Sequence, residues 1–303
     1  MELRTLRYFL AVAQEKNITR AAEILHVTQP TLSRQISDLE EELGTTLFIR
    51  GKRSMELTED GALLRQRAQD IVELADRTEH EFAGKRGGVA GTVVIGATEA
   101  LGGHDLAVAI RRFSQQYPAV RFELYNGMAD VLKERIDKGA LDLGLLLEPV
   151  DTTRYEFIRL ATPERWGVLV HSSHPFAARE QVAVRELIGQ PLMLPNRPSS
   201  RQEILNWIGC EERRLNILVG YNLLSNIALL VEHGVGVAVC LNGALSLHAS
   251  PDLRFVPLVP ERSTRSVLIW KKNQVFSTAT SLFIQSLQAL RDDAAPAELY
   301  KAP

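Results

Sequence analysis

The chain has few of the features that mark secreted or membrane proteins. Its 303 residues include only two cysteines, Cys210 and Cys240, and both lie in apolar surroundings, so we expect buried, reduced thiols rather than disulfides. No apolar run approaches membrane-spanning length, and the segment after Met1 lacks the basic cluster and apolar core of a signal peptide. We therefore expect a cytoplasmic protein that does not contact a membrane.

Signatures of catalysis are also missing. There is no Gly-x-Ser-x-Gly, no His-Glu-x-x-His, no Gly-Lys-Ser/Thr phosphate loop, and no Gly-x-Gly-x-x-Gly after a predicted strand. The nearest approach to a metal site is the pair His171 and His174, on a loop that ends at Pro175, where such a pair is usually plain surface. We expect no enzymatic activity, no cofactor and no metal.

The overall charge does not identify a partner. The formal net charge is −2, with 45% hydrophobic and 24% charged residues, as in an ordinary globular protein long enough for two domains. Because a DNA-binding surface needs local rather than global positive charge, the distribution of the basic residues decides. A basic cluster, Arg50, Lys52 and Arg53, follows Phe48 directly.

A helix-turn-helix pattern lies near the N-terminus. Apolar residues at i, i+3, i+4 and i+7 predict a buried stripe on a first helix at Ile18, Ala21, Ala22 and Leu25, and a second helix has its stripe at Leu32, Ile36, Leu39 and Leu43. Thr28 can cap this second helix by accepting a backbone N–H, and Pro30 suits its first turn. The outer face is short and polar, which favours insertion into the major groove of DNA, although a helical hairpin in an ordinary core gives the same pattern.

The amino-acid sequence of this region is more specific than its pattern of apolar and polar residues. The segments LRTLRYF (3–9), TRAA (19–22), VTQPTLSRQI (27–36) and LEEELGTTLFIR (39–50) closely resemble the LysR-type transcriptional regulators. The resemblance implies a winged helix-turn-helix over residues 1–58, a dimerising linker helix and hinge over 59–88, and an effector-binding domain over 89–303. It also implies four partners: double-stranded DNA, a small-molecule effector, further copies of the chain in a dimer or tetramer, and RNA polymerase.

We expect the second helix and a following two-stranded hairpin, or wing, to contact DNA. The candidates lie on the short polar face or at the basic tip of the hairpin: Arg20, Thr28, Gln29, Pro30, Thr31, Ser33, Arg34, Gln35, Arg50, Lys52 and Arg53. Arg34 and Gln29 are expected to read bases, and Arg50 and Arg53 to contact phosphates or the minor groove. For the tip, a solvated charged turn is the alternative.

A long helix is predicted after Thr58, which can cap it, with Glu59 and Asp60 complementing its N-terminal dipole. Apolar or small residues alternate along it in steps of four and three, which predicts a seam that pairs with a second copy. The seam residues are Leu64, Ala68, Ile71, Ala75, Thr78 and Phe82. A surface helix lying on its own domain is the alternative.

The glycine-rich, basic segment 84–91 is the best domain boundary. Beyond it, predicted strands alternate with predicted helices, which indicates a parallel sheet built from βαβ units. The same alternation begins again after about residue 166. We expect an α+β multidomain chain that ends in a two-lobed α/β domain resembling periplasmic solute-binding proteins. The family resemblance implies lobe I at about 89–161 and 266–303 and lobe II at about 162–265.

Ligands of open α/β folds lie beyond the carboxyl ends of strands, often at helix N-termini that attract anions. The positions that correspond to the effector cleft of LysR-type proteins are Thr98, Glu99, Ala100, Leu101, Asn196, Ser199, Ser200, Arg201, Asn222 and Leu223. Their hydroxyl and amide groups, with Arg201, predict a small polar or anionic metabolite. Glu99 leaves a zwitterion such as an amino acid equally open, and Ser199 and Ser200 could instead be ordinary caps.

Two other functions fit part of the pattern. A solute-binding or transport protein would have two similar lobes, but the helix-turn-helix and the missing signal peptide argue against it. An enzyme with a DNA-binding head would need a nucleophile and a base with recognisable spacing, which the sequence lacks. We therefore expect a sequence-specific DNA-binding transcriptional regulator.

Overall fold

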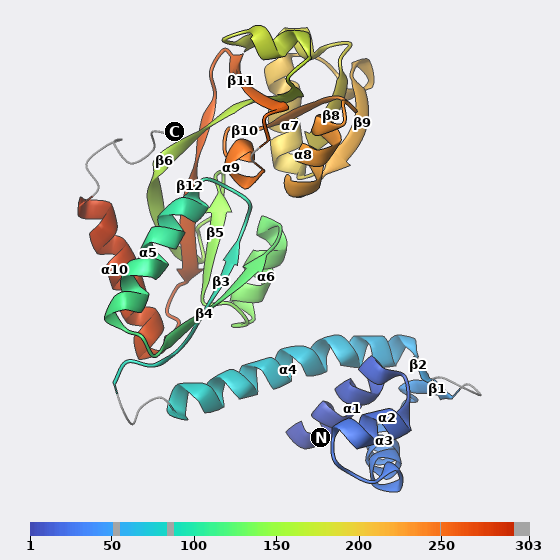
Figure 1. The fold of residues 1–303 in the computed structure, drawn as a ribbon. Coiled ribbons are helices and arrows are strands. Elements are labelled where there is room, and N and C mark those ends of the chain that lie inside the picture. Colours follow the sequence, from blue (N-terminus) through green and yellow to red (C-terminus); the bar gives the residue numbers. More distant parts are fainter. Residues whose placement is uncertain (51–54, 84–87, 249, 294–303) are drawn as a thin grey trace. The chain divides into compact units, whose positions relative to one another are not determined.

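The computed structural model describes residues 1–50, 55–83, 88–248 and 250–293 (Figure 1). The chain divides into two compact units, residues 1–86 and 87–303. Within the described ranges, no helix is both long enough and apolar enough to cross a membrane.

The first unit begins with three helices, α1 (Leu3–Glu15), α2 (Ile18–Ile24) and α3 (Gln29–Leu43). The side chain of Asn17 caps α2 by accepting the backbone N–H groups of Thr19 and Arg20 at 2.9 and 3.1 Å. The predicted stripes are largely confirmed, since α2 and α3 bury Ala21, Ala22, Leu32, Ile36 and Leu39 against the apolar face of α1. Leu43 is the exception, with 41% of its surface exposed at the end of α3.

The wing and a long helix complete this unit. Strand β1 (Phe48–Arg50) pairs antiparallel with β2 (Met55–Leu57), with Phe48 opposite Leu57, and α4 (Glu59–Ala83) follows. As predicted, Thr58 caps α4, because its Oγ1 accepts the backbone N–H of Gly61 at 2.9 Å. Position 61 requires glycine, since a Cβ there would lie 2.1 Å from the carbonyl oxygen of Leu47.

Lobe I of the second unit is a sheet covered on both faces. Strand β3 (Gly91–Ala97) pairs in parallel with β4 (Val120–Asn126) and β5 (Leu143–Leu147), and helices α5 (Gly102–Gln116) and α6 (Ala129–Asp137) connect them. Helices α5 and α10 (Thr278–Asp293) lie together on one face, and α6 covers the other (Figure 1). Strand β12 (Ser263–Lys271) pairs antiparallel with β5, so the C-terminal segments return to lobe I as the resemblance implied.

Lobe II repeats the arrangement of three parallel strands with helices between them. Its parallel strands are β8 (Pro191–Pro195), β9 (Asn216–Tyr221) and β10 (Val237–Leu241). Helix α7 (Pro198–Ile208) packs into one apolar cluster, and α8 (Ser225–Glu232) with α9 (Ala244–Leu247) into another. Strands β7 (Val182–Ala183) and β11 (Leu253–Val259), and the short 3-10 helices Pro175–Ala178, Val184–Leu187 and Glu212–Arg214, complete it.

One strand joins the two lobes. Strand β6 (Tyr155–His171) pairs with β12 through residues 155–165 and with β10 and β11 through residues 166–171, always antiparallel. The predicted parallel pairing of the βαβ strands is confirmed in both lobes, but β6 and β12 run antiparallel to those strands, so the sheet as a whole is mixed. The predicted strand at Trp166–His171 is only the second half of β6. The first half was not predicted as a strand, because many of its residues are polar and exposed and do not form an apolar run.

Candidate functional site

The recognition face of the first unit lies on α3. Thr28, Gln29, Pro30, Thr31 and Arg34 are exposed. Among the described residues nothing pairs with the guanidinium of Arg34. The face therefore presents donors and acceptors directly to solvent at the N-terminal end of the helix, the end from which a recognition helix contacts base edges.

Other predicted DNA-contact residues are partly engaged within the protein. Gln35 is half-buried and accepts the hydroxyl of Thr5 at 3.5 Å, and Arg20 forms an exposed ion pair with Glu15 at 3.0 Å. Ser33 is also half-buried. The side chain of Thr28 was expected to cap α3, but it bonds to the hydroxyl of Thr31 at 2.8 Å and makes no cap hydrogen bond. Lys52, Arg53 and the side chain of Arg50 lie outside the described residues.

The wing is anchored by an acidic residue that the sequence pattern did not single out. The Oε1 atom of Glu40, on α3, accepts the backbone N–H groups of Leu47 and Phe48 at 2.7 and 3.2 Å. Each N–H satisfied in this way would otherwise be left without a partner next to the core. Glu40 therefore fixes where β1 begins relative to the recognition helix.

The predicted seam on α4 needs correction. Ala68 is fully buried and Leu64 packs against the core of its own unit, because the N-terminal half of α4 lies on α1. Ile71 and Leu74, in contrast, are 41% and 50% exposed, and with Ala75, Thr78 and Glu79 they line a shallow, largely apolar groove. Of the predicted seam residues that the structure describes, those left at the surface are thus Ile71, Ala75 and Thr78, in the C-terminal half of the helix; the side chain of Phe82 lies outside the described residues.

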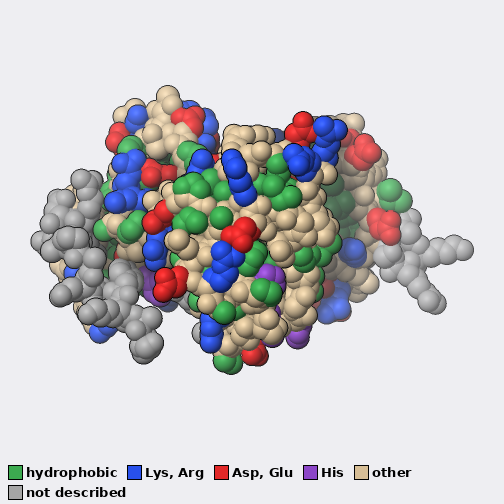
Figure 2. Space-filling model, turned by 90° about the horizontal axis from the view of Figure 1, so that it is seen from above, with side chains coloured by type: hydrophobic (Ala, Val, Ile, Leu, Met, Phe, Trp, Pro, Cys, Tyr) green, Lys and Arg blue, Asp and Glu red, His purple; other side chains and the backbone are tan. Residues whose placement is uncertain are grey.

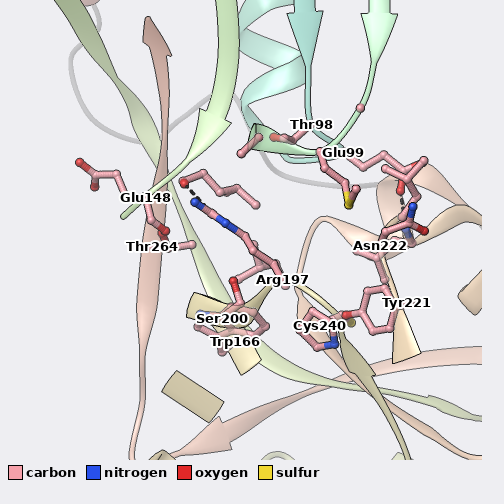
Figure 3. Close-up of a pocket in the computed structure, with 18 residues that line it drawn as sticks. Thr98, Glu99, Glu148, Trp166, Arg197, Ser200, Tyr221, Asn222, Cys240 and Thr264 are labelled. Atoms are coloured by element: carbon pink, nitrogen blue, oxygen red, sulfur yellow. Dashed lines mark hydrogen bonds between the residues drawn. The ribbon is translucent and has the colours of Figure 1, made fainter. Parts of the chain in front are cut away.

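A cavity of about 120 Å³ separates the two lobes of the second unit (Figure 3). Both lobes contribute backbone and side-chain groups to its lining. The lining residues are Thr98, Glu99, Gly127, Met128, Ala129, Leu147, Glu148, Trp166, Pro195, Arg197, Ser200, Tyr221, Asn222, Leu223, Leu224, Cys240, Leu241 and Thr264.

Half of the predicted effector residues line this cavity, namely Thr98, Glu99, Ser200, Asn222 and Leu223. The other half do not: Ala100, Leu101, Asn196, Ser199 and Arg201. Arg201 is committed elsewhere, since its Nη2 and Nε lie 2.7 and 3.2 Å from the carboxylate of Glu212. Its Nη1 donates to Asn196 at 3.2 Å, so Arg201 and Asn196 brace the start of α7 instead of facing a ligand.

The guanidinium that does face the cavity belongs to Arg197, which precedes α7. It reaches lobe I, where Nη2 donates to the carbonyl oxygen of Pro149 at 3.1 Å and Nη1 lies 3.4 Å from that of Leu147 (Figure 3). The sequence pattern missed Arg197 because two arginines stand in the same turn, at 197 and 201. A helix start identifies the turn but not which of the two arginines faces the cavity.

Groups at the floor of the cavity are neutral. The hydroxyl of buried Tyr221 donates to the carbonyl of Val239 at 2.6 Å, and burial raises the pKa of Tyr221 well above its ordinary value. Burial likewise raises the pKa of the Cys240 thiol to about 12, so this cysteine stays protonated. The expectation of buried thiols is confirmed for Cys240, whereas Cys210 is half-buried; both are free.

A buried acid lies where β6 passes from one lobe to the other. Glu164 is fully buried and accepts the hydroxyl of Ser266 at 3.0 Å. Burial raises the pKa of Glu164, although hydrogen bonds from Leu101, Ser266 and Gly102 oppose the rise. This carboxyl therefore links the start of α5 to the strands that join the lobes.

The two histidines considered as metal ligands make local contacts. The Nδ1 atom of His171 lies 2.7 Å from the hydroxyl of Ser173, and that of His174 accepts the backbone N–H of Phe176 at 3.1 Å. Desolvation lowers the pKa of His174. No group of three metal-ligating side chains occurs within the ranges that the structure describes.

Two family models match the chain. The LysR substrate binding domain matches residues 86–291, and the bacterial regulatory helix-turn-helix of the lysR family matches residues 3–62. The chain is 32% identical over 280 residues to the Hca operon transcriptional activator HcaR of Escherichia coli, covering 91% of this chain and 93% of that protein. It is 30% identical over 286 residues to the HTH-type transcriptional regulator BenM of Acinetobacter baylyi, covering 92% of each.

Solved structures share the fold. The crystal structure of full-length CbnR with its target DNA aligns with a TM-score of 0.78 at 24% identity, covering 95% of this chain and 99% of that one. Full-length BenM aligns with a TM-score of 0.54 at 28% identity, covering 96% of each chain. Taken with the exposed recognition helix and the two-lobed domain, these matches show that the chain belongs to the LysR family of DNA-binding transcriptional regulators, with an N-terminal helix-turn-helix and a C-terminal effector-binding domain.

Proposed function

We propose that this regulator responds to a small polar or anionic metabolite that binds in the cavity between lobes I and II. The observation that supports the proposal is that hydroxyl, amide and guanidinium groups from both lobes converge on one cavity, with Thr98 on one side and Arg197, Ser200 and Asn222 on the other. A ligand that touches both lobes binds the closed form more tightly than the open one. It therefore shifts the population toward closure by its difference in affinity.

Transmission to DNA requires more than one copy of the chain. We propose that the exposed stripe Ile71, Leu74, Ala75 and Thr78 pairs α4 with α4 of a second copy. No other described element of its own unit covers this stripe, and pairing would remove its apolar side chains from water. Lobe closure would then change the relative placement of two recognition helices, and the bound oligomer would contact RNA polymerase without catalysing a reaction.

For the DNA complex we propose that different residues contact the bases and the sugar–phosphate backbone. Gln29 and Arg34 read base edges, and Arg20, Thr28, Thr31 and Ser33 contact the sugar–phosphate backbone beside them. Arg50, Lys52 and Arg53 of the wing contact phosphates or the minor groove. Pro30 and Gln35 fix the start and the orientation of the helix.

The effector proposal is tested on the full chain by thermal shift against a metabolite panel, followed by DNA binding with each hit. The double variant Thr98→Val with Ser200→Ala should remove the thermal stabilisation and the effect on DNA occupancy. Thr92→Val, a substitution at the other end of β3, should retain both because Thr92 does not line the cavity. A hit whose stabilisation survives the double variant would place the effector elsewhere.

A further inference from the structure

Glu99 reaches from lobe I to the N-terminus of α8 in lobe II. Its Oε1 accepts the hydroxyl of Ser225 at 2.6 Å, and its Oε2 accepts the backbone N–H of Ser225 at 3.3 Å and also that of Leu224. The N-cap residue of α8, Leu224, makes no side-chain cap hydrogen bond of its own. The carboxylate of Glu99 thus serves as the missing cap, and it does so across the cavity.

This contact changes the charge pattern that a ligand meets. The N-terminus of a helix attracts anions, so the start of α8 would be a place for an effector carboxylate. In this chain the position is already filled by the protein's own carboxylate. Both oxygens of Glu99 already accept hydrogen bonds from α8, so an incoming amine would compete with Leu224 and Ser225 for them.

Arg197 provides the opposite feature. Its contacts across the cavity are to the carbonyl oxygens of Leu147 and Pro149, and among the described residues it forms no ion pair. The second acid of the lining, Glu148, is paired instead with Arg159, whose Nε lies 2.8 Å from it. A guanidinium pairs more strongly with a carboxylate than with neutral carbonyls, because both partners are then charged and two parallel N–H···O bonds can form. We therefore expect an anion that enters the cavity to replace these carbonyl oxygens as the partner of the Arg197 guanidinium.

The remaining lining is largely apolar. Met128, Leu147, Trp166, Leu223 and Leu241 are among its apolar residues. Such walls favour a hydrocarbon body, and a second charged group would be desolvated there without a partner. On the basis of the proposed effector site, we propose that the effector is a monocarboxylate with an apolar body, that Arg197 binds its carboxylate, and that Glu99 excludes a second negative charge.

The test compares three ligands of equal chain length that differ only at the far end. Butyrate, succinate and 4-aminobutyrate end in a methyl, a carboxylate and an ammonium group, and hexanoate, adipate and 6-aminohexanoate repeat the comparison in a longer chain. Binding to the full chain is measured by calorimetry and thermal shift. In at least one series we expect the monocarboxylate to bind about tenfold or more tightly than both matched compounds, because a like charge beside Glu99 and an unpaired ammonium are both penalised.

Variants separate the two roles. Glu99→Ser should raise the affinity for the dicarboxylate relative to the monocarboxylate by about tenfold, because the start of α8 becomes available. Glu99→Gln removes the charge while keeping the shape, and should change the ratio in the same direction if Glu99→Ser does not fold. Glu123→Gln removes an exposed charge outside the cavity and should change nothing. Arg197→Met should abolish monocarboxylate binding and Arg197→Lys should retain part of it, whereas exposed Arg185→Met should have no effect.

Several results would overturn the inference. They are equal or tighter binding of the dicarboxylate or the amino acid by the unmodified chain, an unchanged ratio in both Glu99 variants, or no binding of either monocarboxylate. If a ligand of another charge class binds and the Thr98→Val, Ser200→Ala variant abolishes it, the proposed effector site stands and only the monocarboxylate assignment fails. If ligand binding is indifferent to that double variant, the proposed site itself fails.

Discussion

Aspartate substituted at Ala68 and at Ile71 should have opposite consequences, although only one helical turn separates the two positions on α4. Ala68 is fully buried in the core of the first unit, so a carboxyl group there has no water and no partner. The cost is at least about 3 kcal/mol. That is a large part of the stability of an 86-residue unit, which at typical values per residue is about 4–13 kcal/mol.

Ile71 is 41% exposed in the isolated protomer, so Ile71→Asp should change the stability of the folded monomer by no more than about 1 kcal/mol. In a symmetric pair of α4 helices, however, both copies would bury the new carboxylate. At about 2 kcal/mol each, the pair loses about 4 kcal/mol, which is about a thousandfold in the dimer dissociation constant.

The assays are thermal unfolding followed by circular dichroism, and mass by light scattering at micromolar protein. We expect Ala68→Asp to lower the melting temperature of the helix-turn-helix unit, and Ile71→Asp to remain folded but to lose half its mass and most of its DNA affinity. Gln66→Asp, on an exposed part of α4, is the matched control and should do neither. A dimeric Ile71→Asp protein of unchanged mass would refute the proposed pairing, and an unaltered Ala68→Asp protein would refute the packing of α4 on α1.

Three further substitutions probe the DNA-binding unit and the junction between the lobes. Arg34→Ala should weaken specific DNA binding by about 1–3 kcal/mol and relax sequence preference in a binding-site selection; equal losses on random DNA would contradict base reading. Glu40→Ala should destabilise the unit by about 1–3 kcal/mol in chemical denaturation, because two N–H groups lose their acceptor, while exposed Glu41→Ala should be neutral. Because burial raises the pKa of Glu164 above its ordinary 4.5 in the folded state, the fold loses stability as the pH rises above 4.5 and this carboxyl must ionise while buried. Glu164→Gln should therefore gain stability relative to the unmodified chain as the pH rises above 4.5, and a difference in melting temperature that stays constant with pH would contradict this.

Local features of the fold could be predicted from the sequence. The stripes Ala21–Ala22 and Leu32–Ile36–Leu39 and the cap at Thr58 were identified correctly, because helical periodicity and capping depend on residues within about four positions of one another. The alternation of strands and helices likewise placed Thr98 and Ser200 at strand ends that line the cavity. The family resemblance supplied the return of β12 to lobe I, which no local pattern shows.

The tertiary structure decided how equivalent residues are used. Along α4 a single repeat of small and apolar residues includes Ala68, which α1 covers, and Ile71, which remains exposed; the choice depends on where α1 packs. Arg197 and Arg201 stand in one turn, but Glu212 pairs with Arg201 and so leaves Arg197 for the cavity.

Glu99 shows the same limit most clearly. Its residue type and its place after β3 fit an ordinary first-turn acid, a ligand for an amine or a barrier to anions, and the sequence left these roles open. The contact that distinguishes them joins residues 126 positions apart in the chain, and the contact of Arg197 with Leu147 spans 50. Charge pairing across a cavity depends on distance in space, which becomes fixed only when the two lobes pack together, whereas helices and caps are encoded within a few neighbouring residues.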